Sequence, residues 1–239
     1  SKSINAFIRE YSLAIEQSSM IGLMPTYDSI ESAKVTSEIS TSNSSNVWLG
    51  LDADQEMICV KSLSSQAFKD RVERESFRRG VESLFYLNNC NQPVAPKYLF
   101  HTNVPMSVGM EYVPGTTVNA LFESDRHIIR DNWLDLALSV FRAVLACHTS
   151  EGGVLHRDLK PKNIILEDIY FGADGHEIAN SNVRFINFDM SWHKFSSGNT
   201  KSVAADEVGY YAPEQRVATN VGTPRSAKTD VYMLGMVMV

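Results

Sequence analysis

The chain has 239 residues, of which 44% are hydrophobic, and this length allows a sizeable core to be buried in one or two domains. Its formal net charge is −6 and it contains no run of basic residues, which argues against nucleic acid or an anionic membrane surface as a partner. Charged residues interrupt the most apolar segments well before about 18 positions, so no membrane span is predicted.

The three cysteines, Cys59, Cys90 and Cys147, are widely spaced and form no C-x-x-C pair. Such spacing is typical of reduced thiols rather than of a disulfide or metal framework. The first residues also lack the charged-then-apolar layout of a signal peptide. Together these features predict a cytoplasmic protein.

Hydrophobic periodicity predicts the secondary structure of the first half of the chain. An amphipathic helix is expected over residues 3–17, a polar Ser/Thr/Asn-rich loop over 37–46, and a charged helix over 66–87. Strands are expected at 47–51, 57–61, 98–100 and 106–112.

In the second half, a long helix is expected over 131–148. Its apolar residues recur at helical spacing and predict one strong stripe: Trp133, Leu134, Ala137, Val140, Phe141, Val144 and Leu145. Residues 167–182 separate two short strands. This segment lacks the alternating carboxylates and closing Glu of a calcium loop, so a solvated hairpin insertion is predicted.

Residues 154–163 read Val-Leu-His-Arg-Asp-Leu-Lys-Pro-Lys-Asn and place three different chemical groups on one short segment. Asp158 offers a carboxylate to orient an attacking hydroxyl, Lys160 an ammonium for a moving phosphate, and Asn163 an amide oxygen for a divalent cation. A phosphoryl-transfer site needs this combination. The segment resembles the catalytic loop of eukaryotic-type (Hanks-type) protein kinases, and the position of Lys160 is similar to that in the serine/threonine-specific branch.

Four further segments resemble kinase landmarks in the expected order. Residues 57–61 are similar to the third strand, which ends in the phosphate-holding Lys, and 110–115 to the hinge that reads the adenine edge. Residues 210–214 are similar to the A-P-E segment, and 230–235 to the start of the large helix of the C-lobe. The resemblance implies an α+β, bilobal kinase-like fold with a small β-rich N-lobe and a mainly helical C-lobe.

The resemblance also suggests the domain boundaries. We expect a helical extension over 1–26, the N-lobe over 27–111 and the C-lobe over 112–239. The sequence stops four residues after Gly235, and it holds no later residue to pair with Glu214 as in the family. A truncated C-lobe, with further domains on the same polypeptide, is therefore expected.

The resemblance further implies ATP and Mg²⁺ as ligands and a protein as substrate. Lys61, Asp158 and Lys160 take the catalytic positions, and Asn163 and Asn187 the metal positions. The ATP-binding positions form the phosphate loop, the apolar walls of the adenine pocket and the hinge: Ile39, Ser40, Ser42, Ser45, Val47, Cys59, Lys61, Met110, Glu111, Val113, Ile165 and Ile186.

The phosphate loop departs from the family pattern. Counting back from Val47, Ser40, Ser42 and Ser45 replace the three glycines of the loop. A serine still offers its backbone N–H to a phosphate, but its Cβ restricts positive φ and close approach. Weaker or unusual nucleotide binding is therefore expected.

The metal position also departs from the pattern, because Asn187 stands where the family has the Asp of D-F-G. An Asn keeps the shape but lacks the negative charge that anchors a hard dication. A loss of about 2–3 kcal/mol would slow the reaction roughly a hundredfold. An alternative register makes Asp189 the ligand, but it turns Asn187 inward on its strand in place of an apolar residue and ranks second.

The acidic residue that pairs with the strand Lys in the family is not obvious here. A gapless count puts Gly80 at that position, and three glutamates flank it on the predicted helix: Glu73, Glu75 and Glu82. Glu75 is predicted to reach Lys61 after a small shift of the helix. Glu207 also replaces the Thr that usually precedes the A-P-E segment, which leaves recognition of a peptide substrate open.

Arg157 resembles the Arg of kinases whose activation loop is ordered by phosphorylation through Arg–phosphate pairing. The candidate acceptors of such a phosphate are loop hydroxyls: Ser191, Ser196, Ser197, Thr200 and Ser202.

Three functions compete. The leading hypothesis is a serine/threonine protein kinase that uses MgATP, favoured by the full set of Lys61, Asp158, Lys160 and Asn163. The second is a pseudokinase acting as a nucleotide-binding scaffold or regulatory module, favoured by the changes in the phosphate loop and at Asn187. The third is a small-molecule kinase of the antibiotic- or choline-phosphorylating type, and the A-P-E segment and the Lys160-Pro161 pair argue against it.

Overall fold

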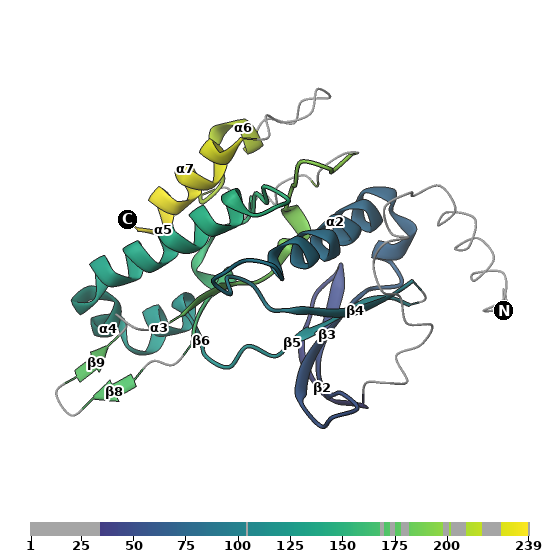
Figure 1. Ribbon diagram of the computed structural model, residues 1–239, viewed down its shortest axis with the longest axis horizontal. Coiled ribbons are helices and arrows are strands. Elements are labelled where there is room, and N and C mark those ends of the chain that lie inside the picture. The colour runs from purple at the N-terminus through teal and green to yellow at the C-terminus, as the bar shows by residue number, and fades with distance from the viewer. Residues whose placement is uncertain are drawn as a thin grey trace, which may run out of the picture. The chain divides into compact units, whose positions relative to one another are not determined.

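A computed structural model describes residues 34–103, 105–167, 170–172, 175–177, 182–197, 201, 209–216 and 226–238 (Figure 1). The helix predicted over 3–17 lies outside these residues. The described chain forms two compact units. The first contains the residues up to Asp70 together with Tyr98–Tyr112, and the second contains Arg71–Lys97 and the residues from Val113 onwards. Residues 71–97 thus group with the second unit, whereas the sequence assigned them to the N-lobe.

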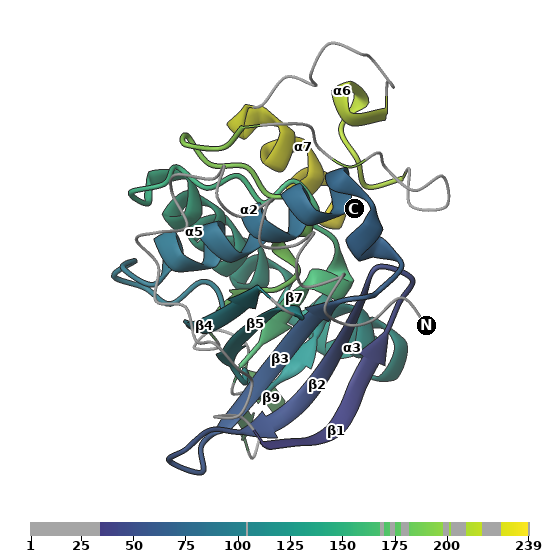
Figure 2. The same cartoon turned by 90° about the vertical axis from the view of Figure 1, so that its right-hand side faces the viewer.

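The first unit is a five-stranded antiparallel sheet in the order β1-β2-β3-β5-β4 (Figure 2). Its strands are β1 (Lys34–Thr41), β2 (Ser45–Leu51), β3 (Met57–Leu63), β4 (Tyr98–Asn103) and β5 (Met106–Glu111), and a short 3-10 turn, η3 (Ala67–Lys69), follows β3. Ile58, Val60 and Phe100 form its buried apolar cluster. Gly109 on β5 leaves room for the Phe100 ring, which occupies the space that a Cβ would need.

The polar loop predicted over 37–46 is correct only for residues 42–44, because β1 continues to Thr41 and β2 begins at Ser45. The β-branched side chains of β1, Ile39 among them, favour extended backbone. Pairing along β2, with Ser40 opposite Val47, supplies the backbone hydrogen bonds that a solvated loop would lack. The polar composition of this segment therefore reflects an exposed edge strand.

The second unit is mainly helical. Its helices are α2 (Arg71–Leu87), α3 (Val118–Ser124), α4 (Arg126–Asp131), α5 (Trp133–Thr149), α6 (Pro213–Arg216) and α7 (Ala227–Val237), with 3-10 turns η4 (Pro161–Asn163) and η5 (Phe188–Met190). Its short strands are β6 (Thr116–Thr117), β7 (Ile164–Leu166), β8 (Tyr170–Gly172), β9 (Gly175–Glu177) and β10 (Val183–Phe185). β10, β7 and β6 form one antiparallel sheet, and β8 and β9 pair as a separate hairpin within the predicted insertion (Figure 1). No helix in the described parts of the chain is long and apolar enough to cross a membrane.

The single helix predicted over 66–87 is wrong in its first turn. η3 ends at Lys69, and Asp70 has an extended backbone with φ −87° and ψ 125° before α2 begins at Arg71. Asp is favoured in this conformation at the start of a helix, because its side chain can accept from free backbone N–H groups. The charged periodicity runs through this break and conceals it.

The apolar stripe predicted on the long helix divides into two faces of α5. Ala137, Val140 and Val144 are buried, together with further small and branched residues of the same face. The other four residues of the stripe are exposed by 50% or more: Trp133, Leu134, Phe141 and Leu145. Periodicity alone could not separate these faces, because the apolar residues cover more of the helix than its contacts in the described chain do.

Candidate active site

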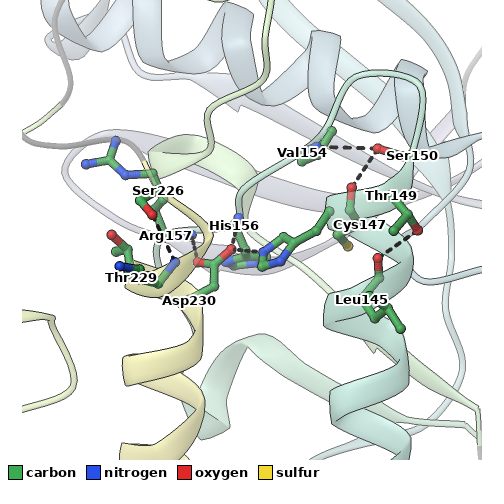
Figure 3. A network of polar contacts seen from close by, with 12 residues as sticks. Leu145, Cys147, Thr149, Ser150, Val154, His156, Arg157, Ser226, Thr229 and Asp230 are labelled. Atoms are coloured by element: carbon green, nitrogen blue, oxygen red, sulfur yellow. Dashed lines mark hydrogen bonds and ion pairs between the residues drawn. The ribbon is translucent and has the colours of Figure 1, made fainter.

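The loop that follows α5 is held by one carboxylate from α7 (Figure 3). Asp230 accepts the backbone N–H of His156 at Oδ2 (2.8 Å) and that of Arg157 at Oδ1 (2.7 Å). The Nε2 of His148 lies 2.8 Å from the same Oδ2. Arg157 has φ 62°, which non-glycine residues rarely adopt, and Gln215 donates to its carbonyl at 2.9 Å. Buried polar groups therefore determine the shape of this loop.

The ring of His156 joins the loop to the segment after β10. Its Nε2 lies 3.0 Å from the carbonyl oxygen of Ile186, and its Nδ1 accepts the N–H of Asp158 at 3.2 Å. Burial lowers the pKa of His156, although the charges of Asp230 and Asp158 oppose this effect. A neutral ring protonated at Nε2 fits these contacts, because that nitrogen then donates to the carbonyl.

The carboxylate of Asp158 receives four polar contacts and is only 3% exposed. Its Oδ1 accepts from the Tyr211 hydroxyl at 2.6 Å and lies 3.3 Å from the Lys160 ammonium. Its Oδ2 accepts from the side-chain nitrogens of Asn163 at 2.8 Å and Asn187 at 3.2 Å. Four residues predicted from the sequence thus meet at one point, and Tyr211 joins them without having been predicted.

In a comparison with known protein families, the protein kinase domain family matches residues 34–239. The chain belongs to the protein kinase family. The kinase-like fold expected from the sequence, with a β-sheet unit and a mainly helical unit, is thereby confirmed.

Relatives of this kinase chain include proteins of bacteria and yeast. A probable serine/threonine-protein kinase of Streptomyces coelicolor is 27% identical over 76% of this chain, and one of Clostridium acetobutylicum is 26% identical over 86%. The SNF1-like protein kinase ssp2 of Schizosaccharomyces pombe is 26% identical over 77%. The matched regions cover 25%, 29% and 29% of these relatives, so the chain spans less than a third of their length.

Of the two registers considered for the kinase metal position, the geometry favours the first. Asn187 contacts Asp158, whereas Asp189 lies 3.7 Å from the Lys201 ammonium. Asn187 has φ 65° and ψ 68°, a left-handed conformation that Asn tolerates better than most residues. The polar side chain therefore points toward the catalytic loop and does not enter an apolar core.

The two predicted metal-position residues, Asn163 and Asn187, both contact Asp158 in the structure. An Asn side chain can offer a cation only its neutral amide oxygen, and the side-chain nitrogen of each of these residues donates to Asp158. Mg²⁺ usually requires one or two carboxylates in addition to phosphate oxygens. In the described part of the chain, no three His, Cys, Asp or Glu side chains cluster in a way that could hold a metal.

Several of the predicted ATP-binding residues share one face of the sheet in the first unit. Lys61 on β3 lies opposite Val47, and Cys59, two residues earlier, lies opposite Met110. Cross-strand partners and residues two apart in a strand point to the same face. Burial raises the pKa of Cys59 to about 11, against the smaller opposing effect of the Lys61 charge, so Cys59 is an uncharged thiol.

The remaining predicted ATP-binding residues are divided between the two units. Ile39 on β1 is 51% exposed, and Glu111 ends β5. In the second unit Val113 is buried, and Ile165 lies on β7 opposite Thr117. Their joint role in nucleotide binding stays a prediction.

The serines of the phosphate loop form hydrogen bonds with one another. The Ser42 N–H donates to the Ser45 carbonyl at 2.9 Å, and the Ser45 N–H donates to the Ser42 Oγ at 3.0 Å. Positive φ among the described non-glycine residues occurs only at Gln55, Arg157 and Asn187. The turn therefore lacks the backbone conformation for which the family uses glycine, and the N–H of Ser45 is already engaged.

Helix α2 packs closely against η5, the turn that follows Asn187, and this close approach explains why residue 80 is a glycine. A Cβ at residue 80 would lie 3.1 Å from the carbonyl oxygen of Phe188, so the helix backbone approaches η5 closely and a side chain there would need η5 to shift by a few tenths of an ångström. The family's Glu at this position of the gapless count would therefore crowd the Phe188 carbonyl, and the glycine here avoids that contact.

The flanking glutamates of α2 have partners in the second unit. Glu75 accepts from Arg71 at 2.7 Å, and Glu73 lies 2.5 Å from the Lys201 ammonium. Glu82 lies 3.0 Å from the Nε2 of His193. The predicted pairing of Glu75 with Lys61 is not tested by these contacts.

The proposed regulatory residues differ in accessibility. Ser191 is fully buried and shares a hydrogen bond with Ser83 at 2.8 Å, so a phosphate could not be added without local opening. Ser197 is exposed, and the hydroxyl of Ser196 accepts the His193 N–H at 3.0 Å. Arg157 is buried, with its Nη1 3.5 Å from the Met190 carbonyl. Thr200, Ser202 and Glu207 lie outside the described residues.

Proposed function

We propose that this chain is the catalytic part of a serine/threonine protein kinase that transfers the γ-phosphate of ATP to protein hydroxyls. The observation that carries the proposal is the Asp158 carboxylate with the Lys160 ammonium 3.3 Å away on the same loop. A substrate hydroxyl would donate to Asp158 Oδ1 while its oxygen bonds to the γ-phosphorus. The bond from that phosphorus to ADP then breaks, and the hydroxyl proton passes to the carboxylate.

Lys160 contributes by electrostatics in this reaction. Its ammonium would stabilise negative charge on the phosphoryl oxygens as they move, and it is 8% exposed, where such an interaction is stronger than in water. The family implies that magnesium arrives with ATP. Because Asn187 supplies no carboxylate to hold that ion, we propose that the chain as it stands is roughly a hundredfold slower than a form with Asp at 187.

Radiolabel transfer from ATP to a generic protein such as casein tests this proposal. The chain and its Asn187→Asp variant would be compared with the Asn187→Asp, Asp158→Asn double variant, which keeps the shape of the site but lacks its base. We expect transfer by the single variant, weak transfer by the chain and none by the double variant. Equal transfer with and without Asp158 would refute the assignment.

A pseudokinase is the second candidate, and one contact favours it. The Asn187 side chain donates to Asp158, so two residues that handle metal and substrate in an active kinase here satisfy each other. The turn between Ser42 and Ser45 also favours a pseudokinase, because the Ser45 N–H already donates to the Ser42 Oγ. If neither the chain nor Asn187→Asp transfers phosphate while both bind ATP, the pseudokinase is the better description.

A further inference from the structure

The hydroxyl of Tyr211 occupies one oxygen of the carboxylate proposed to receive the substrate. It donates to Asp158 Oδ1 at 2.6 Å, which is a short, charge-assisted hydrogen bond. The side chain is 3% exposed and comes from the segment directly before α6, 53 residues further along the chain. A phenol here has the same donor group as a substrate serine or threonine.

The remaining contacts of the carboxylate leave no second place for a substrate hydroxyl. Oδ2 accepts from both Asn163 and Asn187, and Oδ1 faces Lys160. A hydroxyl that attacks a phosphoryl group next to Lys160 must therefore approach Oδ1, where Tyr211 is bound. Each carboxylate oxygen has about two lone-pair sites, and in this structure all are directed at donors.

The segment that carries Tyr211 is bound to the catalytic loop through Gln215 and held in shape by hydrogen bonds within itself. Gln215 donates to the Arg157 carbonyl at 2.9 Å and accepts from the Ala212 N–H at 3.2 Å. Arg216 donates to the Tyr211 carbonyl at 2.7 Å. The contact of Tyr211 with Asp158 is therefore part of a folded segment, and the phenol cannot leave unless this segment moves or its side chain rotates.

We propose that Tyr211 is an internal competitor of the protein substrate: its phenol holds the hydroxyl position on Asp158 and must be displaced before transfer. This inference rests on the proposed kinase function. A competitor raises the KM for the protein substrate and leaves kcat and the KM for ATP unchanged. A tyrosine that merely positioned Asp158 would instead support kcat.

The test uses Asn187→Asp as the parent, with Tyr211→Phe added and Tyr210→Phe as the matched control from the neighbouring half-buried position. Initial rates would be measured over a range of casein and of ATP. Because a hydrogen bond to a charged group is lost, we expect Tyr211→Phe to lower the KM for casein roughly tenfold. The kcat, the KM for ATP and the kinetics of Tyr210→Phe should stay at the parent values. Thermal unfolding of each variant would establish that it is folded.

The outcomes separate this inference from the function on which it rests. If the parent transfers phosphate and Tyr211→Phe leaves the KM for casein unchanged, only the inference fails. A folded Tyr211→Phe with a lower kcat also overturns it, because Tyr211 then positions Asp158. If the parent transfers no phosphate to any substrate, the proposed function fails and the inference falls with it.

Discussion

Replacing Asn187 by Asp should weaken the protein without metal and make its stability depend on magnesium. In the structure the side-chain nitrogen of Asn187 donates to Asp158 Oδ2 at 3.2 Å. A carboxylate at 187 has no such donor and brings a second negative oxygen toward a buried one. The variant that restores the usual kinase residue therefore creates a repulsion that only a cation relieves.

The size of this effect follows from the separation of the two side chains. At 3.2 Å, two unit charges repel by about 5 kcal/mol at an effective dielectric constant of about 20. Rotation of the new side chain and the nearby Lys160 ammonium reduce this value, whereas the lost hydrogen bond adds to it. We expect a net loss of about 2 kcal/mol, which lowers the unfolding temperature by about 4–8 °C for a chain of this size.

Thermal unfolding of the chain and of Asn187→Asp, each in EDTA and in millimolar MgCl₂, measures this prediction. Magnesium should recover most of the loss in the variant and change the parent little, because the cation is attracted to two carboxylates rather than one. Adding Asp158→Asn is the control and should remove the magnesium response. Equal stability of variant and parent in EDTA would refute the reasoning.

Three further predictions concern packing and reactivity. Gly80→Val should lower the free energy of unfolding by about 2 kcal/mol, because even a Cβ there would lie 3.1 Å from the Phe188 carbonyl oxygen. A free energy of unfolding in urea that equals the parent's would contradict this prediction. Desolvation raises the pKa of Cys59 to about 11, so at pH 8 only roughly a thousandth of it is thiolate. Iodoacetamide should alkylate Cys59 at least about a hundredfold faster in the unfolded chain, and comparable rates would contradict the raised pKa. Val140→Ala, at a fully buried site of α5, should lower the free energy of unfolding in urea by about 2 kcal/mol, whereas Leu138→Ala, at a site 44% exposed on the same helix, should lower it by less than about 1 kcal/mol. Similar losses for the two variants would show that α5 does not have one buried and one exposed face.

The catalytic loop could be recognised from the sequence because its chemistry is local. Asp158, Lys160 and Asn163 lie within six residues, and a chain that short must bring their side chains close together. The helix over 133–149 and the strands over 45–51 and 57–63 were likewise predictable, because their periodic patterns recur within one element.

Weaker local signals led to errors. The exposed edge strand β1 has the composition of a loop, and the break at Asp70 is concealed by charged periodicity. The apolar residues of α5 could not be assigned to a buried or an exposed face, because burial depends on which elements lie against the helix. Amino-acid composition is a property of one segment, whereas strand pairing and burial depend on the elements that lie next to that segment.

The sequence by itself predicted which groups would carry the chemistry: a carboxylate, an ammonium and two amides at kinase spacing. Only the tertiary structure decided what surrounds them. Asp230 is 74 residues from His156, and Tyr211 is 53 residues from Asp158, so neither contact has a local pattern. Both contacts form because α7 and the segment before α6 pack on the catalytic loop. A buried carboxylate needs hydrogen-bond donors, and the fold supplies them here from residues that are distant in the sequence.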